Sequence, residues 1–163
     1  MSPDKAEGAK LDRMKSVLED CPEKGSFGLS TGLNEVPSSY ADIDELTEVC
    51  RVVERHGGLY TSHLRDYKFR LLEAVDEALE LGRRTGVSVE LSHLQAVGRK
   101  NWHLQDAVLD RIEESSPQGV DVGMDAYPCV SGSCISPRCC RCGRWMVVRL
   151  RCLACETLRR AGA

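Results

Sequence analysis

The chain has 163 residues, of which 42% are hydrophobic and 29% charged, and its formal net charge is −3. This length and composition predict one globular domain and exclude a fibrous or intrinsically disordered chain. No apolar run approaches the ~20 residues of a membrane-spanning helix, and the first residues lack the apolar segment of a secretory signal, so we expect a cytoplasmic protein with no membrane partner.

Charge and cysteine are distributed unevenly along the chain. Residues 138–163 contain seven arginines and one acidic residue, a net charge of +6, so the preceding residues carry −9. Five of the nine cysteines lie in the same segment. An acidic body repels phosphate backbones, so we expect no nucleic-acid partner. We divide the sequence into a body, residues 1–132, and a tail rich in cysteine and arginine, residues 133–163.

Helices and strands are predicted to alternate along the body. Apolar residues three and four positions apart predict helices over residues 11–20, 42–56, 71–84 and 104–115. Short β-rich runs predict strands over residues 26–33, 59–64, 87–91 and 120–124. One helix between successive strands, with a period of about 30 residues, is typical of right-handed βαβ units in a parallel sheet.

Four such units favour an α/β fold that is part of a (β/α) TIM-type barrel, since a whole barrel has eight units. A doubly wound sheet is the alternative. Neither a GxGxxG turn nor a phosphate-binding loop follows any predicted strand, so a nucleotide site has no support.

Functional side chains in parallel α/β folds lie where the strands end. The residues at these predicted ends are Ser30, Thr31, His63, Arg65, His93, Asp125 and Tyr127. His63 and His93 lie at the ends of adjacent strands, where two neutral imidazoles would suit a Zn²⁺ ion; alternatively, each caps its strand through a hydrogen bond. The other two histidines, His56 and His103, are predicted to be structural.

Three charged features near these ends leave alternatives open. Arg65 is predicted to point toward the same place as His63 and to hold a substrate carboxylate; otherwise it pairs on the surface with Asp66 or Asp76. Asp125 is a metal ligand, a general base or an acceptor for backbone amides of a loop. One helix face, predicted to be solvated, carries Glu73, Asp76, Glu77 and Glu80.

A series of motifs occurs in the body in the order Gly25-Ser-Phe-Gly-Leu-Ser-Thr-Gly-Leu33, Tyr40-Ala41, Gly57-Gly58-Leu-Tyr60, Ser62-His63-Leu-Arg65-Asp66, Ser92-His93-Leu94, Gly98, Asn101-Trp102 and Asp125-Ala-Tyr127-Pro128. Together these motifs resemble those of the N-acyl-D-amino-acid deacylases (D-aminoacylases) of the amidohydrolase superfamily. The resemblance implies a metal-bearing barrel that hydrolyses the amide of N-acylated D-amino acids. It also implies that His63 and His93 bind zinc and that Arg65 and Tyr127 lie at the substrate site.

The sequence also departs from this family. The family's His-x-His pair on the first strand, its metal-binding cysteine and its catalytic aspartate on a late strand have no counterpart in this sequence. Gln95 stands where the family usually has lysine after Ser-His-Leu. Cys129 stands where the family has tyrosine. Because catalytic zinc normally has three protein ligands, we expect a fragment of a deacylase whose activity alone is in doubt.

The tail allows two interpretations. Its two Cys-x2-Cys pairs, Cys139/Cys142 and Cys152/Cys155, could supply four thiolates to structural zinc. Their nine-residue separation is shorter than the usual 15–20, and the resemblance stops just before this segment. These two facts favour a disordered segment or a change of reading frame near Ser133 over a zinc module.

Two further hypotheses remain beside the deacylase. One is a non-catalytic half-barrel that associates with itself through open sheet edges, with or without a zinc-binding tail. The other is an amidohydrolase that acts on a cyclic amide or a related C–N bond.

Overall fold

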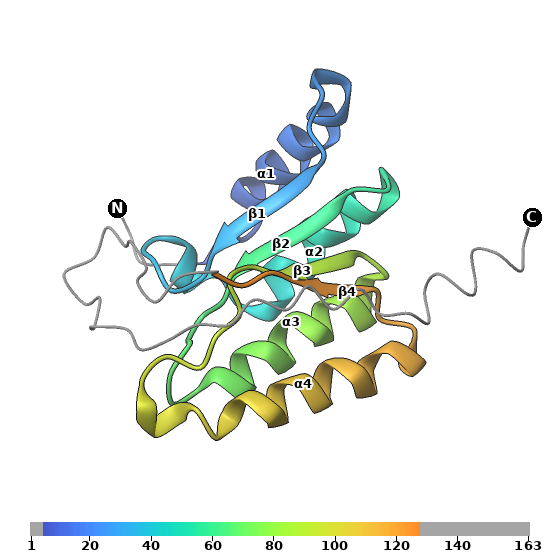
Figure 1. Ribbon diagram of the computed structural model, residues 1–163. Coiled ribbons are helices and arrows are strands. Elements are labelled where there is room, and N and C mark those ends of the chain that lie inside the picture. The colour runs from blue at the N-terminus through green and yellow to red at the C-terminus, as the bar shows by residue number, and fades with distance from the viewer. Residues whose placement is uncertain (1–4, 128–163) are drawn as a thin grey trace, which may run out of the picture.

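The computed structural model describes residues 5–127, and Figure 1 shows a parallel sheet covered by helices. The strands are β1 (Gly28–Gly32), β2 (Leu59–His63), β3 (Ser88–Leu91) and β4 (Val122–Met124). The helices are α1 (Ala9–Asp20), α2 (Ile43–Arg55), α3 (Leu71–Thr85) and α4 (Leu104–Ser115), with short 3₁₀ turns at Pro22–Lys24, Ser38–Tyr40, Arg99–Asn101 and Ser116–Gln118. These eight elements are the predicted ones, and the prediction of alternating helices and strands is confirmed. The tail, including both Cys-x2-Cys pairs, lies outside the described residues.

The four strands are all parallel and follow one another across the sheet in chain order. A doubly wound sheet reverses its strand order at a switch point. Among residues 5–127 the order does not reverse, so the described strands do not support the doubly wound alternative. Right-handed connections that always step in one direction put their helices on the same face. Accordingly, α2 packs against α1 and α3, and α3 against α4 (Figure 1).

The two faces of the sheet have different compositions. One register row, Leu29, Tyr60, Val89 and Val122, belongs to the hydrophobic core that the sheet shares with the helices. The next row, Ser30, Thr61, Glu90 and Gly123, lies on the opposite face, because side chains alternate along a strand. The helix-covered face is therefore the apolar face, and small and polar residues line the other.

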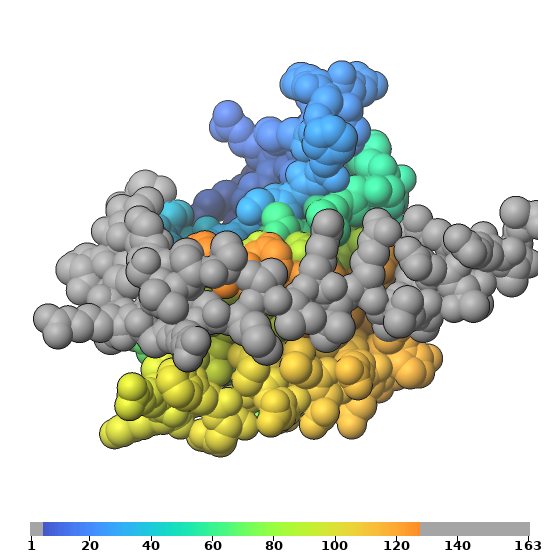
Figure 2. Space-filling view, viewed as in Figure 1, coloured from blue at the N-terminus to red at the C-terminus, as the bar shows by residue number. Residues whose placement is uncertain are grey.

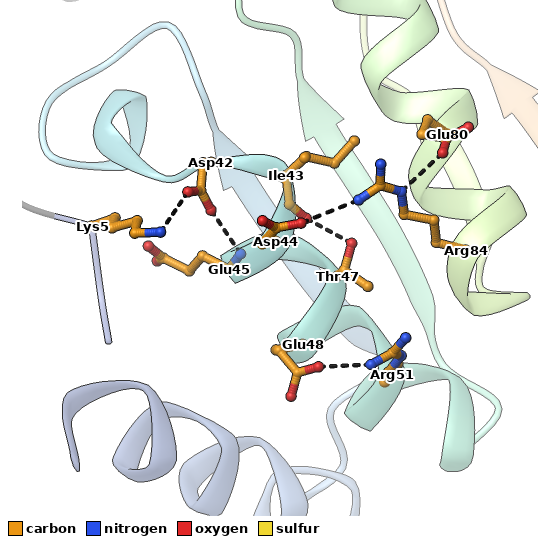
Figure 3. Close-up of polar contacts among 10 residues, drawn as sticks. All are labelled: Lys5, Asp42, Ile43, Asp44, Glu45, Thr47, Glu48, Arg51, Glu80 and Arg84. Carbon is orange, nitrogen blue, oxygen red and sulfur yellow. Dashed lines mark hydrogen bonds and ion pairs between the residues drawn. The ribbon is translucent and has the colours of Figure 1, made fainter. Parts of the chain in front are cut away.

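Local sequence explains where the helices begin and end. The Asp42 carboxylate accepts a hydrogen bond from the Glu45 amide at 2.9 Å and caps α2, as Figure 3 shows. Helix α3 ends at Gly86, its C-cap residue, which has φ 77°, a left-handed conformation that glycine adopts at little cost. Arg84 of α3 pairs with Asp44 of α2 and with Glu80, so side chains also join these two helices (Figure 3).

The segment that joins α1 to β1 projects from one end of the molecule in Figures 1 and 2. Phe27, which precedes β1, is 91% exposed there. An apolar groove of about 450 Å³ lies between α1, β1 and α2, and Val17 and Leu29 are among its lining residues. Among the described residues, no helix combines the length and apolar character needed to cross a membrane.

Candidate metal centre

His63 and His93 lie next to each other at the ends of adjacent strands. His63 is the last residue of β2, and His93 follows the end of β3 by two residues. Their ring centroids are 4.3 Å apart, with the rings inclined by 71°. The predicted juxtaposition of the two imidazoles is therefore present, whereas their role as metal ligands stays a prediction.

The loop after β3 holds His93 in an unusual conformation. His93 has φ 39°, which is uncommon for a residue with a side chain and occurs often at functional sites. Asp125, just beyond β4, holds the turn through two contacts. Its carboxylate accepts the His93 amide at 2.7 Å, and its carbonyl accepts the Leu94 amide at 2.7 Å. Of the three alternatives for Asp125, the structure shows the acceptor for backbone amides.

Both imidazoles lie in surroundings that favour the neutral ring. Burial lowers the pKa of His63, and the neighbouring His93 lowers it further. Burial also lowers the pKa of His93, although its own backbone and Asp125 act in the opposite direction. Metal ions bind the neutral imidazole, so the lowered pKa values keep both rings in the form that can bind a metal.

The donor atoms fit part of a zinc site. The Nδ1 atom of His93 is buried and has no hydrogen-bond partner among the described residues, so this nitrogen is not occupied by another protein group. Within residues 5–127, however, no group of three histidine, cysteine or acidic side chains is placed to hold a metal. The described chain thus supplies two imidazole ligands, and a catalytic zinc site needs a third protein ligand.

Tyr127 lies beside the pair. Its ring stacks on that of His93, with centroids 5.4 Å apart and planes within 4°. A substrate-binding role for Tyr127 stays a prediction. The stacking places its ring next to the histidine pair, where a substrate bound at that pair would lie.

Arg65 has other partners than those predicted. Its guanidinium donates to both carboxylate oxygens of Glu77 at 2.9 Å and to the carbonyls of Ser39 and Ala41 at 2.8 Å. The expected surface partners, Asp66 or Asp76, are not the ones observed. Glu77 is also only 19% exposed in its side chain, so the prediction that it belongs to a solvated face is wrong. A substrate role for Arg65 stays a prediction that would require these bonds to be exchanged.

The remaining histidines lie at helix ends, as predicted. His56 is the C-cap residue of α2 and contacts Glu19 at 2.7 Å through Nε2. His103 is the N-cap residue of α4 and makes no side-chain capping bond. Both lie at the ends of helices, in agreement with a structural role.

Sequence reasoning missed Tyr67, whose ring lies 5.2 Å from the rings of both His63 and His93. Its hydroxyl accepts the Leu64 amide at 2.7 Å and donates to the Ser92 carbonyl at 3.0 Å. Burial raises the pKa of Tyr67, which keeps this hydroxyl protonated and able to donate. The only signal in the sequence is an aromatic residue four positions after His63, which does not by itself indicate where its ring lies.

The chain is similar to curated D-amino-acid deacylases over about three quarters of its length. It is 35% identical over 124 residues to a D-aminoacylase of Alcaligenes xylosoxydans xylosoxydans, covering 76% of the chain and 25% of the relative. It is 40% identical over 122 residues to an N-acyl-D-glutamate deacylase of the same organism, covering 75% and 25%. The chain therefore spans about a quarter of the length of these relatives. No protein-family model matches it.

Solved structures agree with these similarities. A crystal structure of D-aminoacylase, described as defining a subset of amidohydrolases, superimposes with a TM-score of 0.75 at 33% identity, covering 80% of this chain and 27% of that one. N-acyl-D-glutamate deacylase from Bordetella bronchiseptica, solved with zinc and a phosphonate inhibitor, gives 0.75 at 35% identity, covering 79% and 27%. The resemblance read from the motifs is thereby confirmed: the chain is similar in sequence and fold to N-acyl-D-amino-acid deacylases, over about a quarter of their length.

Proposed function

We propose that this chain is part of a zinc-dependent deacylase that hydrolyses the amide bond of N-acyl-D-amino acids. The observation that carries the proposal is the pair of neutral imidazoles with ring centroids 4.3 Å apart, at adjacent ends of parallel strands. Two curated relatives are a D-aminoacylase and an N-acyl-D-glutamate deacylase, and the related structure from Bordetella bronchiseptica contains zinc. The four βα units would then be half of an eight-stranded barrel.

The residues of the chain have distinct tasks in this proposal. His63 and His93 hold the metal through ring nitrogens, and Asp125 keeps His93 in place through the backbone amide. A zinc ion bound there supplies Lewis-acid polarisation of the acyl carbonyl. Tyr127, stacked on His93, borders the substrate, and Arg65 binds its carboxylate after release from Glu77. The described residues provide neither a third ligand group nor an assigned base, so we expect the chain alone to bind zinc weakly.

Zinc titration of the full chain tests the proposal. We expect His63→Ala and His93→Ala each to weaken zinc affinity by at least about tenfold, since each removes a ligand. His56→Ala is the matched control, because this histidine is also partly exposed but pairs with Glu19 at a helix end. Hydrolysis of an N-acetyl-D-amino acid with added zinc is measured on the same proteins. Zinc binding or turnover that survives both substitutions would refute the ligand roles.

A second candidate is a non-catalytic half-barrel that associates with itself. It is favoured by the edge of the sheet at β1, which pairs only with β2 among the described residues, and by the exposure of Gly28 and Ser30. This candidate predicts association without hydrolysis.

A further inference from the structure

The hydrogen-bond ladder between β2 and β3 is interrupted next to the two histidines. The amide of Ser92 donates to the carbonyl of Ser62 at 3.1 Å, which is a regular rung. In a parallel ladder with this register, the next rung would run from the amide of Leu64 to the carbonyl of Ser92. The hydroxyl of Tyr67 stands between these two groups instead, accepting from Leu64 and donating to Ser92.

This inserted hydroxyl bears directly on both imidazoles. Leu64 follows His63, and Ser92 precedes His93, so each bonded group is one residue from a histidine. The ring of Tyr67 contacts both imidazoles, edge-on to His63 at 82° and tilted to His93 at 48°. In addition, the backbone carbonyl of Tyr67 accepts the Val97 amide at 2.7 Å, which fixes the loop after β3 at a further point.

We propose that Tyr67 is a positioning residue that sets the separation of His63 and His93 by keeping β2 and β3 one hydroxyl apart. The inference rests on the proposed function, because the spacing matters to the extent that both rings bind one metal. Without the hydroxyl, the amide of Leu64 and the carbonyl of Ser92 bond directly and draw the two strand ends together. A ligand pair held at the wrong distance binds a metal less well.

Tyr67→Phe in the full chain is the test, with Tyr60→Phe as its matched control. Tyr60 is also a buried tyrosine of the β2 region, the second residue of the strand, and its hydroxyl contacts Thr31 at 2.8 Å, on the opposite face of the sheet from His63. Both variants lose one buried hydrogen-bonding hydroxyl and keep the ring, so we expect comparable decreases in Tm. We expect Tyr67→Phe to weaken Zn²⁺ affinity by about tenfold, and Tyr60→Phe to stay within about twofold of the wild type.

A second measurement needs no metal. Nuclear Overhauser effects between the rings of His63 and His93 are recorded in the metal-free proteins. We expect them to change in Tyr67→Phe and to persist in Tyr60→Phe. Unchanged ring contacts in Tyr67→Phe, or a zinc affinity equal to that of Tyr60→Phe, would overturn the positioning role and leave the proposed metal site standing. If the ring contacts change in Tyr67→Phe but neither the wild type nor any variant binds zinc, the positioning role is supported and the proposed function is refuted.

Discussion

Arg65 joins three segments of the chain through one guanidinium. Its fork of donors binds the carboxylate of Glu77 on α3 at two points and reaches two carbonyls in the segment that precedes α2. The side chains of Arg65 and Glu77 are 29% and 19% exposed, so the pair is shielded from water more than an ordinary surface ion pair. This geometry favours a structural contribution in the metal-free chain.

Replacement of Arg65 measures that contribution. A lysine has one compact ammonium group and cannot make four bonds in these directions. We therefore expect Arg65→Lys to lower the free energy of unfolding in urea by about 2 kcal/mol. The control is Arg51→Lys, since Arg51 is 54% exposed and pairs with Glu48 one helical turn away; there we expect a change within ~0.5 kcal/mol. Equal losses in the two variants would contradict a structural role for Arg65.

The neighbours of a residue can be predicted from sequence where the direction of the strands determines which residues meet. His63 and His93 could be paired from sequence, because parallel strands end at the same edge of a sheet. The partner of Arg65 could not, because Asp76 and Glu77 are adjacent in sequence but face different neighbours. Asp76 pairs with Arg111 of α4, and Glu77 faces the loop after β2. The place of Tyr67 between the two strands could not be predicted either, because it depends on how the loop after β2 folds back over the hydrogen-bond ladder.

Helix α2 shows how one polar residue begins an element that carries much of the core. Asp42 caps its first turn, and the helix buries Leu46, Val49 and Val53 against its neighbours. The hydrogen bond to the Lys5 ammonium is the main cause that lowers the pKa of Asp42, and the Glu45 amide lowers it further. The carboxylate is therefore favoured in the folded chain.

Asp42→Ala should destabilise the protein by about 1 kcal/mol at pH 7, the usual cost of losing a cap. Asp42→Asn should lose less, because asparagine caps nearly as well. A carboxylate with a lowered pKa stabilises the fold above its unfolded pKa of about 3.9, and this stabilisation disappears as the pH falls through the lower folded value. Urea unfolding at pH 7 and near pH 3 should thus show a smaller difference between wild type and Asp42→Ala in acid. An equal difference at both pH values would contradict a charged cap.

Element existence was predictable because the periodicity is strong and each helix has a clear end. The helix predicted over residues 42–56 is observed as Ile43–Arg55 between the cap residues Asp42 and His56. The first strand was harder to delimit. It was predicted over residues 26–33 but begins at Gly28, after a turn in which Gly25 has φ 87°. Several glycines and small residues in this segment give no apolar alternation from which its start could be read.

At the scale of the molecule, the strand order makes this sheet a segment with two ends. Within residues 5–127, β1 and β4 each have one neighbour, whereas a barrel closes by joining its first and last strands. Successive βα units could be predicted from the sequence, because strands and helices alternate with a regular period. Closure of the sheet into a barrel could not be predicted, since it depends on strands other than the four described, and the barrel stays a proposal.

The edge at β1 makes self-association testable. The amide of Leu59 donates to the carbonyl of Phe27, and the amide of Leu33 donates to that of His63. With the alternation of a parallel ladder, the amide of Ser30 then points away from β2, toward the open edge. Such an edge can pair with a strand of a second copy, and a proline at a position whose amide faces outward blocks that pairing without breaking the existing ladder.

Ser30→Pro should therefore shift the chain toward the monomer, while Ser30→Ala, which keeps the amide, should associate like the wild type. Sedimentation velocity over a range of protein concentrations measures the distribution, and circular dichroism checks that the proline variant keeps its fold. Because the substitution acts on the backbone at the edge and leaves His63 and His93 unchanged, zinc affinity should be the same in all three proteins if the metal pair belongs to one copy. Association that is identical in the three proteins would show that the β1 edge is not the surface through which copies meet.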